Sequence, residues 1–476
     1  MRRVFVVSDL HLGGAPGGPD QPDFQMCAPA SRRRLADFFV WAAGHRSADR
    51  DVHIVINGDI VDFLAEEDPK AATGFAAFTA DEAEARRKLE RIFERTHEVW
   101  DGLRAARERG ARVSLVLGNH DVELTLPACR RALVERLGGG ALDLVFNGEA
   151  LPLGPVLIEH GNRSDAWNQI DHDTLRELCS ELSRREQTDR KLQTPGSELV
   201  VRVMNELKKD YAFIDLLKPE GGAVLPLLAV LEPGALRQLV EIAALLPKLA
   251  TRWIDTVGKP YDRRNIGDWA GGLEPESGQD MGAALDEDLE LARALAGEDG
   301  QEVASFDKLL VLLAGWREAV EERARELLLS RLLRALRWLN RDDRTFDVGH
   351  EHDPYLSAAR AAARRGFRCV VFGHTHKVKR VDLGGGATYL NTGTWADLMR
   401  LPEKLHGSED VARAELTRFL KCLESNDLAE YREQHPTFAQ IDHDFADHVE
   451  SDVSYFSAPD EVTPVPTGTL ERRPAN

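Results

Sequence analysis

The chain has 476 residues, of which 43 % are hydrophobic and 30 % are charged, so its composition is that of a folded globular protein. This length exceeds one ordinary compact core and predicts a main domain with a large insertion or a second lobe. The formal net charge of -19 argues against general nucleic-acid binding, which needs clustered Lys and Arg, although a local basic groove stays open.

Short β-branched apolar runs predict buried strands in the N-terminal part of the chain. These runs are residues 3–8, 52–57, 112–117 and 156–159. Between them, residues 31–43 and 81–109 have helical spacing, with Thr79 as the expected N-cap and Gly110 as the expected stop of the second helix. Strands that alternate with helices predict an α/β fold, which places ligands at the carboxyl ends of its strands.

The pattern changes to amphipathic helices after about residue 171, which predicts a helical insertion over residues 171–345. Residues 267–282 and 297–301 within it are expected to be exposed loops. Strand-like runs return at 367–372 and 387–391, so the main domain should comprise residues 1–170 and 346–456. Helices are expected after Trp395, and residues 457–476, which lack periodicity, are expected to be a flexible tail.

The cysteines and the apolar segments bear on where the chain resides. The five cysteines are scattered without a C-x-x-C pair, which favours a reducing compartment, and we expect the cytoplasm. The apolar run that opens the chain is too short for a signal-peptide core. Residues 223–253 are the most apolar stretch, but charged residues and Pro233 interrupt it, so no transmembrane span is predicted. Peripheral contact with a membrane stays open.

Groups that bind metals follow the predicted strands in five short segments. The segments are DLH at 9–11, GDIVD at 58–62, GNHD at 118–121, HGN at 160–162 and GHTH at 373–376. Taken singly, each has an ordinary explanation as a turn or a helix cap. Taken together, their carboxylate, imidazole and carboxamide groups suit Mn, Fe, Zn or Co, and their place at strand ends predicts a paired metal site.

The ordered series DLHLG, GDIVDF, GNHD, EHGN and GHTH resembles the signature of the calcineurin-like metallophosphoesterase superfamily. The resemblance implies an α/β fold with a β-sandwich flanked by helices (αββα). It further implies two divalent ions, Mn first among the expected metals, and a bridging hydroxide that hydrolyses a phosphoester or pyrophosphate bond. By position, it implies these ligands: Asp9, His11 and His376 for one ion, Asn119, His160 and His374 for the other, and Asp59 for both.

Further polar residues beside these ligands are candidates for other roles. His120 is expected to stabilise the transition state or to protonate the leaving oxygen, with Asp121 orienting its ring; alternatively, His120 only supports Asn119. Asp62 is expected to hold a loop or a metal-bound imidazole. Arg163 is a candidate contact for a substrate phosphate, with a surface ion pair as the alternative. The histidines of GHEHD at 349–353 are expected in a loop or at a helix cap.

The substrate is less determined than the chemistry, because specificity resides in loops and insertions. EHGNRSDAWN and YLNTGTW resemble bacterial members grouped with UDP-2,3-diacylglucosamine pyrophosphatases, which usually have Arg in place of His120 and Asp in place of Asn162. Protein serine/threonine phosphatases have an Arg-Gly pair where this chain has Phe63-Leu64. We expect a small phosphorylated or nucleotide-linked substrate and hypothesise that the insertion selects it as a cap. A nuclease or phosphodiesterase acting on nucleic acid and an inactive phosphate-binding module are the alternatives.

Overall fold

The computed structural model describes the chain in two units. The described residues are 2–15, 24–71, 74–138, 143–145, 150–165, 167–218, 224, 227–228, 230–231, 329–330, 332–337, 340–341, 343–444 and 448–475. The first unit comprises Met1–Asn205, Arg344–Asp397 and Glu433–Asn476, and the second comprises Glu206–Asp343 and Leu398–Arg432. Every predicted site residue belongs to the first unit.

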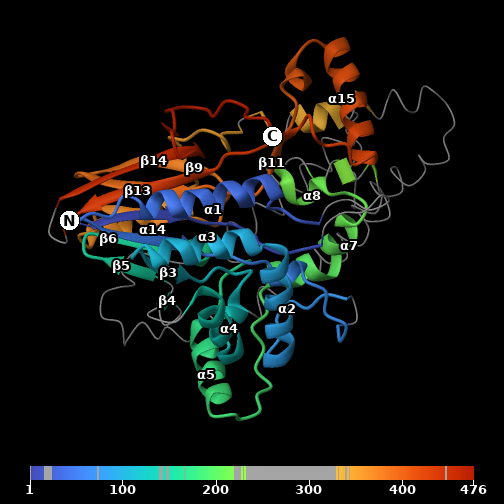
Figure 1. Cartoon of the computed structure of the whole chain (residues 1–476). Coiled ribbons are helices and arrows are strands. Elements are labelled where there is room, and N and C mark those ends of the chain that lie inside the picture. The colour runs from blue at the N-terminus through green and yellow to red at the C-terminus, as the bar shows by residue number, and fades with distance from the viewer. Residues whose placement is uncertain are drawn as a thin grey trace. The chain divides into compact units, whose positions relative to one another are not determined.

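The larger sheet of the first unit has seven strands (Figure 1). In order across the sheet they are β15 (Glu461–Pro464), β14 (Val449–Ala458), β13 (Thr437–His443), β1 (Arg2–Val7), β2 (Asp51–Asn57), β3 (Arg112–Val116) and β4 (Asp143–Val145). Strands β1 to β4 are parallel, and β13 joins β1 in the antiparallel sense. The apolar runs predicted β1, β2 and β3 but not β4.

The second sheet has five strands and is formed by segments on both sides of the insertion. Its order is β5 (Ala150–Leu153), β6 (Val156–Glu159), β8 (Cys369–Phe372), β10 (Ala387–Thr392) and β9 (Val378–Gly384). Because β8 pairs in parallel with both β6 and β10, the sheet resumes after the insertion as predicted. Strands β9 and β10 contact β13 and β14 of the larger sheet, so the two sheets face each other.

Helices lie outside the two sheets. They are α1 (Pro29–Ala43), α2 (Glu82–Arg95), α3 (His97–Glu108), α4 (Pro127–Leu137), α5 (His172–Ser183), α6 (Pro195–Leu199) and α14 (Asp353–Arg364), with a π-helical turn at Val200–Met204. Helix α1 packs on α3 and contacts β2 and β14, whereas α14 contacts β8, β9 and β10. This α/β arrangement is consistent with the predicted sandwich flanked by helices.

An aromatic cluster joins α1 to strands from both ends of the sequence. Phe38 of α1 is fully buried, and its ring centroid lies 5.0 Å from that of Phe438 on β13, 5.3 Å from Phe456 on β14 and 5.4 Å from Trp395. Phe5 of β1 meets Phe38 edge to face. The core therefore depends on segments that are more than four hundred residues apart in the chain.

The long helix predicted over residues 81–109 is two helices that meet at Thr96. The hydroxyl of Thr96 donates to the carbonyl of Ile92 at 2.7 Å and accepts the indole N–H of Trp100 at 3.0 Å, which stabilises the break. The predicted N-cap Thr79 is wrong, because the side chain of Asp81 accepts the first free N–H groups of α2. Gly110 ends α3 with φ +87°, as predicted.

The C-terminal part of the chain differs from its prediction. Among the described residues after Trp395, α15 (Glu409–Glu424) and the turn Glu403–His406 are the helical segments. Strands β13, β14 and β15 follow where no strands were predicted. The expected flexible tail begins inside β14 and includes β15, and Leu470 donates its N–H to the carbonyl of Phe346 at 2.8 Å. Composition alone could not predict that these residues form strands, because distant segments of the chain supply their pairing partners.

The second unit holds part of the predicted insertion. Its described elements include α7 (Asn205–Lys208), α8 (Phe213–Leu216) and the parallel pair β7 (Leu217–Lys218) and β11 (Leu398–Arg400), with β12 (Arg432–Glu433) beside β11. Residues 232–328, with both predicted loops, lie outside the described residues, so the helical character of the insertion stays a prediction. In the described part of the chain, no helix combines the length and apolarity needed to cross a membrane.

We expect Phe38→Ala to lower the free energy of unfolding by about 3–5 kcal/mol, because it opens a cavity in a fully buried aromatic cluster. Urea denaturation followed by tryptophan fluorescence measures this change. The control is Val134→Ala on α4, where the side chain is 41 % exposed and a change within about 0.5 kcal/mol is expected. Equal effects of the two substitutions would show that Phe38 is not central to the core.

Candidate metal centre

The predicted ligands come together at one edge of the first unit. The strands that precede them are β1 for Asp9 and His11, β2 for Asp59, β3 for Asn119, β6 for His160, and β8 for His374 and His376. Because β1, β2 and β3 are parallel, their carboxyl ends meet at the same edge, and the parallel pair β6 and β8 supplies the other groups. Motifs at the ends of different strands were predicted to lie close together, and the pairing of these strands places them at one edge.

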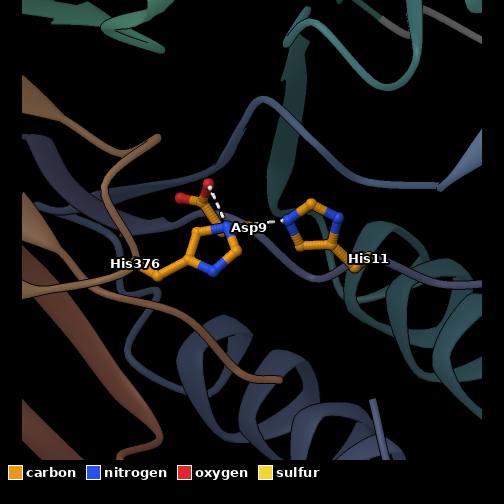
Figure 2. Close-up of side chains that lie close together, drawn as sticks. All are labelled: Asp9, His11 and His376. Atoms are coloured by element: carbon orange, nitrogen blue, oxygen red, sulfur yellow. Dashed lines mark hydrogen bonds and ion pairs between the residues drawn. The ribbon is translucent and has the colours of Figure 1, made fainter. Parts of the chain in front are cut away.

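One cluster consists of Asp9, His11 and His376 (Figure 2). The Nε2 atoms of His11 and His376 lie 2.9 Å apart, and Nε2 of His376 lies 3.5 Å from Oδ1 of Asp9. Asp9 and His11 are buried, so neither group is solvated by bulk water. Two imidazoles and a carboxylate that converge in this way form a donor set suited to a transition-metal cation.

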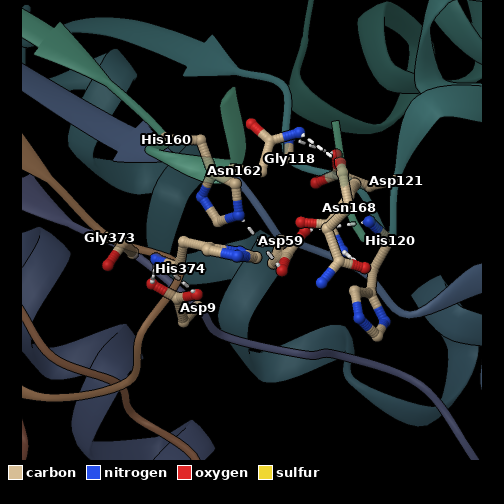
Figure 3. A network of polar contacts seen from close by, with 12 residues as sticks. Asp9, Asp59, Gly118, His120, Asp121, His160, Asn162, Asn168, Gly373 and His374 are labelled. Carbon is tan, nitrogen blue, oxygen red and sulfur yellow. Dashed lines mark hydrogen bonds and ion pairs between the residues drawn. The ribbon is translucent and has the colours of Figure 1, made fainter. Parts of the chain in front are cut away.

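A second cluster consists of Asp59, His160 and His374 (Figure 3). Oδ2 of Asp59 lies 3.2 Å from Nε2 of His160 and 3.8 Å from Nε2 of His11. This single oxygen therefore faces one imidazole from each cluster. A carboxylate in that position has the geometry expected of a group shared by two cations.

Asn119, the predicted carboxamide ligand, follows strand β3. Asn119 is buried, and among the described residues its Oδ1 atom has no hydrogen-bond donor, whereas its Nδ2 atom lies 3.5 Å from Oδ1 of Asn168. A buried amide oxygen without a donor costs free energy, so native proteins rarely retain one unless it binds an ion or water. The residues present therefore fit the metal pair that the sequence implies.

The backbone is strained where it presents several of these side chains. Positive φ angles are found at Asp9 (53°), His11 (44°), Asp59 (48°), His374 (69°) and His376 (60°). Non-glycine residues in this region cost on the order of 1 kcal/mol each, and such residues concentrate at functional sites. Hydrogen bonds between the loops offset the strain, for example from the N–H of His11 to the carbonyl of Asp59 at 2.9 Å.

Glycines before two of the ligands allow the loops to approach closely. A Cβ atom at Gly118 would lie 2.0 Å from Oδ1 of Asp59, and one at Gly58 would lie 2.3 Å from Nδ1 of His160. Gly58 also has φ +81°, which other residues rarely adopt. The glycines of the GD and GN motifs are thus required by contact with the ligands themselves.

The ring of His120 contacts Asp62. Its Nδ1 atom lies 3.1 Å from Oδ1 of Asp62, and its backbone N–H donates to Oδ1 of Asp59 at 2.9 Å. Asp121 is fully buried and accepts the N–H groups of Ile60 and Gly118, both at 2.7 Å. These backbone donors hold the Asp121 carboxylate in the turn, and an orienting role of Asp121 for the His120 ring stays a prediction.

Asp62 holds a loop, as predicted, and its carboxylate also lies beside two imidazoles. Its Oδ1 atom accepts the N–H groups of Leu64 and Ala65, which caps the 3-10 turn Phe63–Ala65. Its Oδ2 atom lies 3.8 Å from Nδ1 of His11, so the carboxylate stands between His11 and His120. A group of His11, Asp62 and His120 results, which shares His11 with the first cluster.

The charges of the clustered groups stabilise one another. Burial raises the pKa of Asp59, but His160, His120 and His11 outweigh it and hold this pKa well below its usual range. Burial lowers the pKa of His160, yet the carboxylates of Asp59 and Asp9 raise it to about 10. The buried carboxylates thus stabilise positive charge on the neighbouring imidazoles. A metal cation would benefit from the same attraction and would compete with the protons for these groups.

Arg163, His350 and His352 belong to none of the possible metal groups of the described residues. Arg163 is exposed on the 3-10 turn Asn162–Ser164 that follows His160. His352 is the N-cap residue of α14, but its side chain makes no capping hydrogen bond.

Two residues of the site were not predicted. Oδ2 of Asp165 lies 3.0 Å from Nε2 of His374, and Asn168 donates from Nδ2 to the same oxygen at 2.7 Å. Both follow the HGN motif within EHGNRSDAWN. They lie six and nine residues after the end of β6, so a search at strand ends could not find them. The polar residues directly after the motif were the available signal.

Comparison with known families agrees with this geometry. Residues 2–214 match the family described as Calcineurin-like phosphoesterase. This part of the chain is a calcineurin-like phosphoesterase domain. The family is one of metal-dependent phosphoesterases that typically bind two divalent metals, and the His and Asp clusters of this domain fit such a site. A comparison with curated proteins found no match.

We expect Gly118→Ala to impair metal binding in this domain, because the added Cβ must displace Asp59 from its place between the clusters. Isothermal titration with Mn²⁺ measures the effect. Gly349→Ala is the control, since its Cβ would meet only Oδ1 of Asp347 at an ordinary 3.5 Å. Unchanged Mn²⁺ affinity in Gly118→Ala would contradict the close approach of the two loops.

Proposed function

We propose that the chain is a binuclear-metal hydrolase of phosphoester or pyrophosphate bonds. The observation that carries the proposal is the position of Asp59, whose Oδ2 atom lies between Nε2 of His160 and Nε2 of His11. Family membership of residues 2–214 supports the same chemistry. No comparable arrangement is needed for a domain that only has to fold, because burying clustered charges is costly.

The proposed ligand sets follow the two clusters. One cation would be held by Asp9, His11 and His376, and the other by Asn119, His160 and His374. Both cations would be contacted by Asp59. Mn²⁺ is the first candidate, with Fe, Zn or Co as alternatives, because this donor set accepts all four. When bound, the ions supply Lewis acidity that activates water and neutralises charge on a phosphoryl group.

His120 is proposed to act on the leaving oxygen or on the charge of the transition state. Its side chain is 20 % exposed, whereas those of His11 and His160 are each 1 % exposed, so it can reach a substrate from the rim of the site. Asp62 contacts Nδ1 and so holds the ring in one orientation, which general acid catalysis through Nε2 requires. Asp62 is thus proposed as an orienting partner of His120.

The proposed substrate is a small phosphorylated or nucleotide-linked molecule. The net charge of -19 supports this over a nucleic acid, because a long polyanion would be repelled outside the immediate metal site. Arg163 is proposed to contact a substrate phosphate. A cytoplasmic location is proposed because all five cysteines are free.

We expect hydrolysis of bis-p-nitrophenyl phosphate that EDTA abolishes and Mn²⁺ restores. Asp59→Ala should lower turnover about a hundredfold or more, because the loss of several kcal/mol of charge stabilisation has that effect on rate. Asp51→Ala, an exposed carboxylate at the start of the same strand β2, is the control and should leave turnover unchanged. The assay should be repeated with phosphomonoesters, nucleotide-linked pyrophosphates and single-stranded DNA.

The outcomes of that screen separate the alternatives. Protein that binds Mn²⁺ but hydrolyses none of these substrates would be the inactive binding module. Preferential cleavage of DNA would favour the nuclease.

We expect His120→Asn to lower kcat by about 10²–10⁴-fold for substrates with alkyl leaving groups, which need a proton, and by much less for p-nitrophenyl esters. Mn²⁺ affinity should not change, because His120 is outside the proposed ligand sets. Equal losses for both leaving groups would exclude protonation and assign His120 to charge stabilisation. Wild-type kcat with alkyl esters would contradict any catalytic role.

A further inference from the structure

Asp165 is held in place by donors on both of its carboxylate oxygens. Oδ1 accepts the backbone N–H of Trp167 at 2.9 Å, and Oδ2 accepts Nδ2 of Asn168 at 2.7 Å. The same Oδ2 atom lies 3.0 Å from Nε2 of His374. Donors on both oxygens therefore hold the carboxylate, and its Oδ2 atom contacts the ring of one predicted ligand, His374.

This contact determines which nitrogen of His374 faces a cation. A carboxylate that accepts from Nε2 keeps the proton on that atom, so the lone pair of the neutral ring remains on Nδ1. His374 shares a possible metal group with Asp59 and His160, and its ring extends towards them (Figure 3). Without Asp165, the ring could rotate or adopt the other tautomer.

Asn168, which donates to Asp165, also contacts Asn119. Its Oδ1 atom lies 3.5 Å from Nδ2 of Asn119, which leaves Oδ1 of Asn119 as the atom without a donor. Two neighbours fix the position of Asn168. Its backbone carbonyl accepts Nδ2 of Asn162 at 2.9 Å. Its side chain packs so closely on Gly196 that a Cβ atom there would lie 2.2 Å from Oδ1. Asp165 and Asn168 thus contact His374 and Asn119, which follow strands of different sheets.

We propose that Asp165 and Asn168 are positioning residues that set His374 and Asn119 for the second cation. The inference rests on the proposed function, since it concerns one of the two metal sites of that hydrolase. Neither residue contacts the first cluster of Asp9, His11 and His376 through any hydrogen bond of the described residues. Their effect should therefore be confined to one site of the pair.

The test is Mn²⁺ binding to the full-length Asp165→Asn variant, measured by isothermal titration and by electron paramagnetic resonance. We expect one of the two sites to weaken about 10–100-fold, the usual cost of losing a carboxylate partner of a metal-bound imidazole. The spectrum of the spin-coupled Mn²⁺ pair should then be replaced by that of a single ion at subsaturating Mn²⁺. A purely structural role would lower the melting temperature without this spectral change.

Matched variants make the result interpretable. Asp173→Asn removes the same charge from α5, where the carboxylate pairs with Arg176 at the surface, and should bind two Mn²⁺ ions like the wild type. Asn168→Ala removes the donor to Asp165 and the partner of Asn119, and should weaken the same site even if Asp165→Asn does not fold.

Two results would overturn the inference, and they are distinguishable. Wild-type affinity and an unchanged spectrum in Asp165→Asn, or in Asn168→Ala if the first variant does not fold, would refute the positioning role and leave the proposed function standing. A wild-type protein that takes up no pair of ions would refute the proposed function and the inference with it.

Discussion

The structure of the first unit depends on a set of buried charged groups. Each is stabilised by its neighbours, and moving one would leave the others buried without a partner. Asp59 has imidazoles on two sides, and these hold its pKa low although the carboxylate is buried. Asp9 receives the backbone N–H of His374 on both oxygens at 3.0 Å. Charges of this kind are tolerated only when each has several partners, so the loops that carry them must be positioned closely.

The two facing sheets meet that requirement. Parallel strands bring their carboxyl ends to one edge, and each sheet contributes ligands that the other lacks. The hydrogen bond from the N–H of Gly373 to the carbonyl of His160 at 2.8 Å joins the last two ligand loops. The aromatic cluster around Phe38 fixes the layers behind this edge, so the strain in the loops is balanced by packing elsewhere.

The sequence predicted those parts of the site that follow directly from strands. Asp9, Asp59 and His160 each follow an unbroken apolar run, and such runs are recognisable without a structure. The contact of His120 with Asp62 was not predicted, because Asp121 adjoins His120 in the sequence whereas Asp62 lies 58 residues away. The strands after Trp395 were missed because their pairing depends on β1, which lies at the opposite end of the sequence.

The pairing of β1 with β13 also has a consequence during synthesis on the ribosome. A nascent chain that has emerged through residue 121 already contains β1, β2 and β3 with their three motifs, but β1 is still an open edge strand. Its neighbour begins at Thr437, so over three hundred residues must be translated before that edge is covered. Uncovered apolar edges promote misassociation, and this protein would therefore depend on chaperones for longer than one whose sheet closes locally.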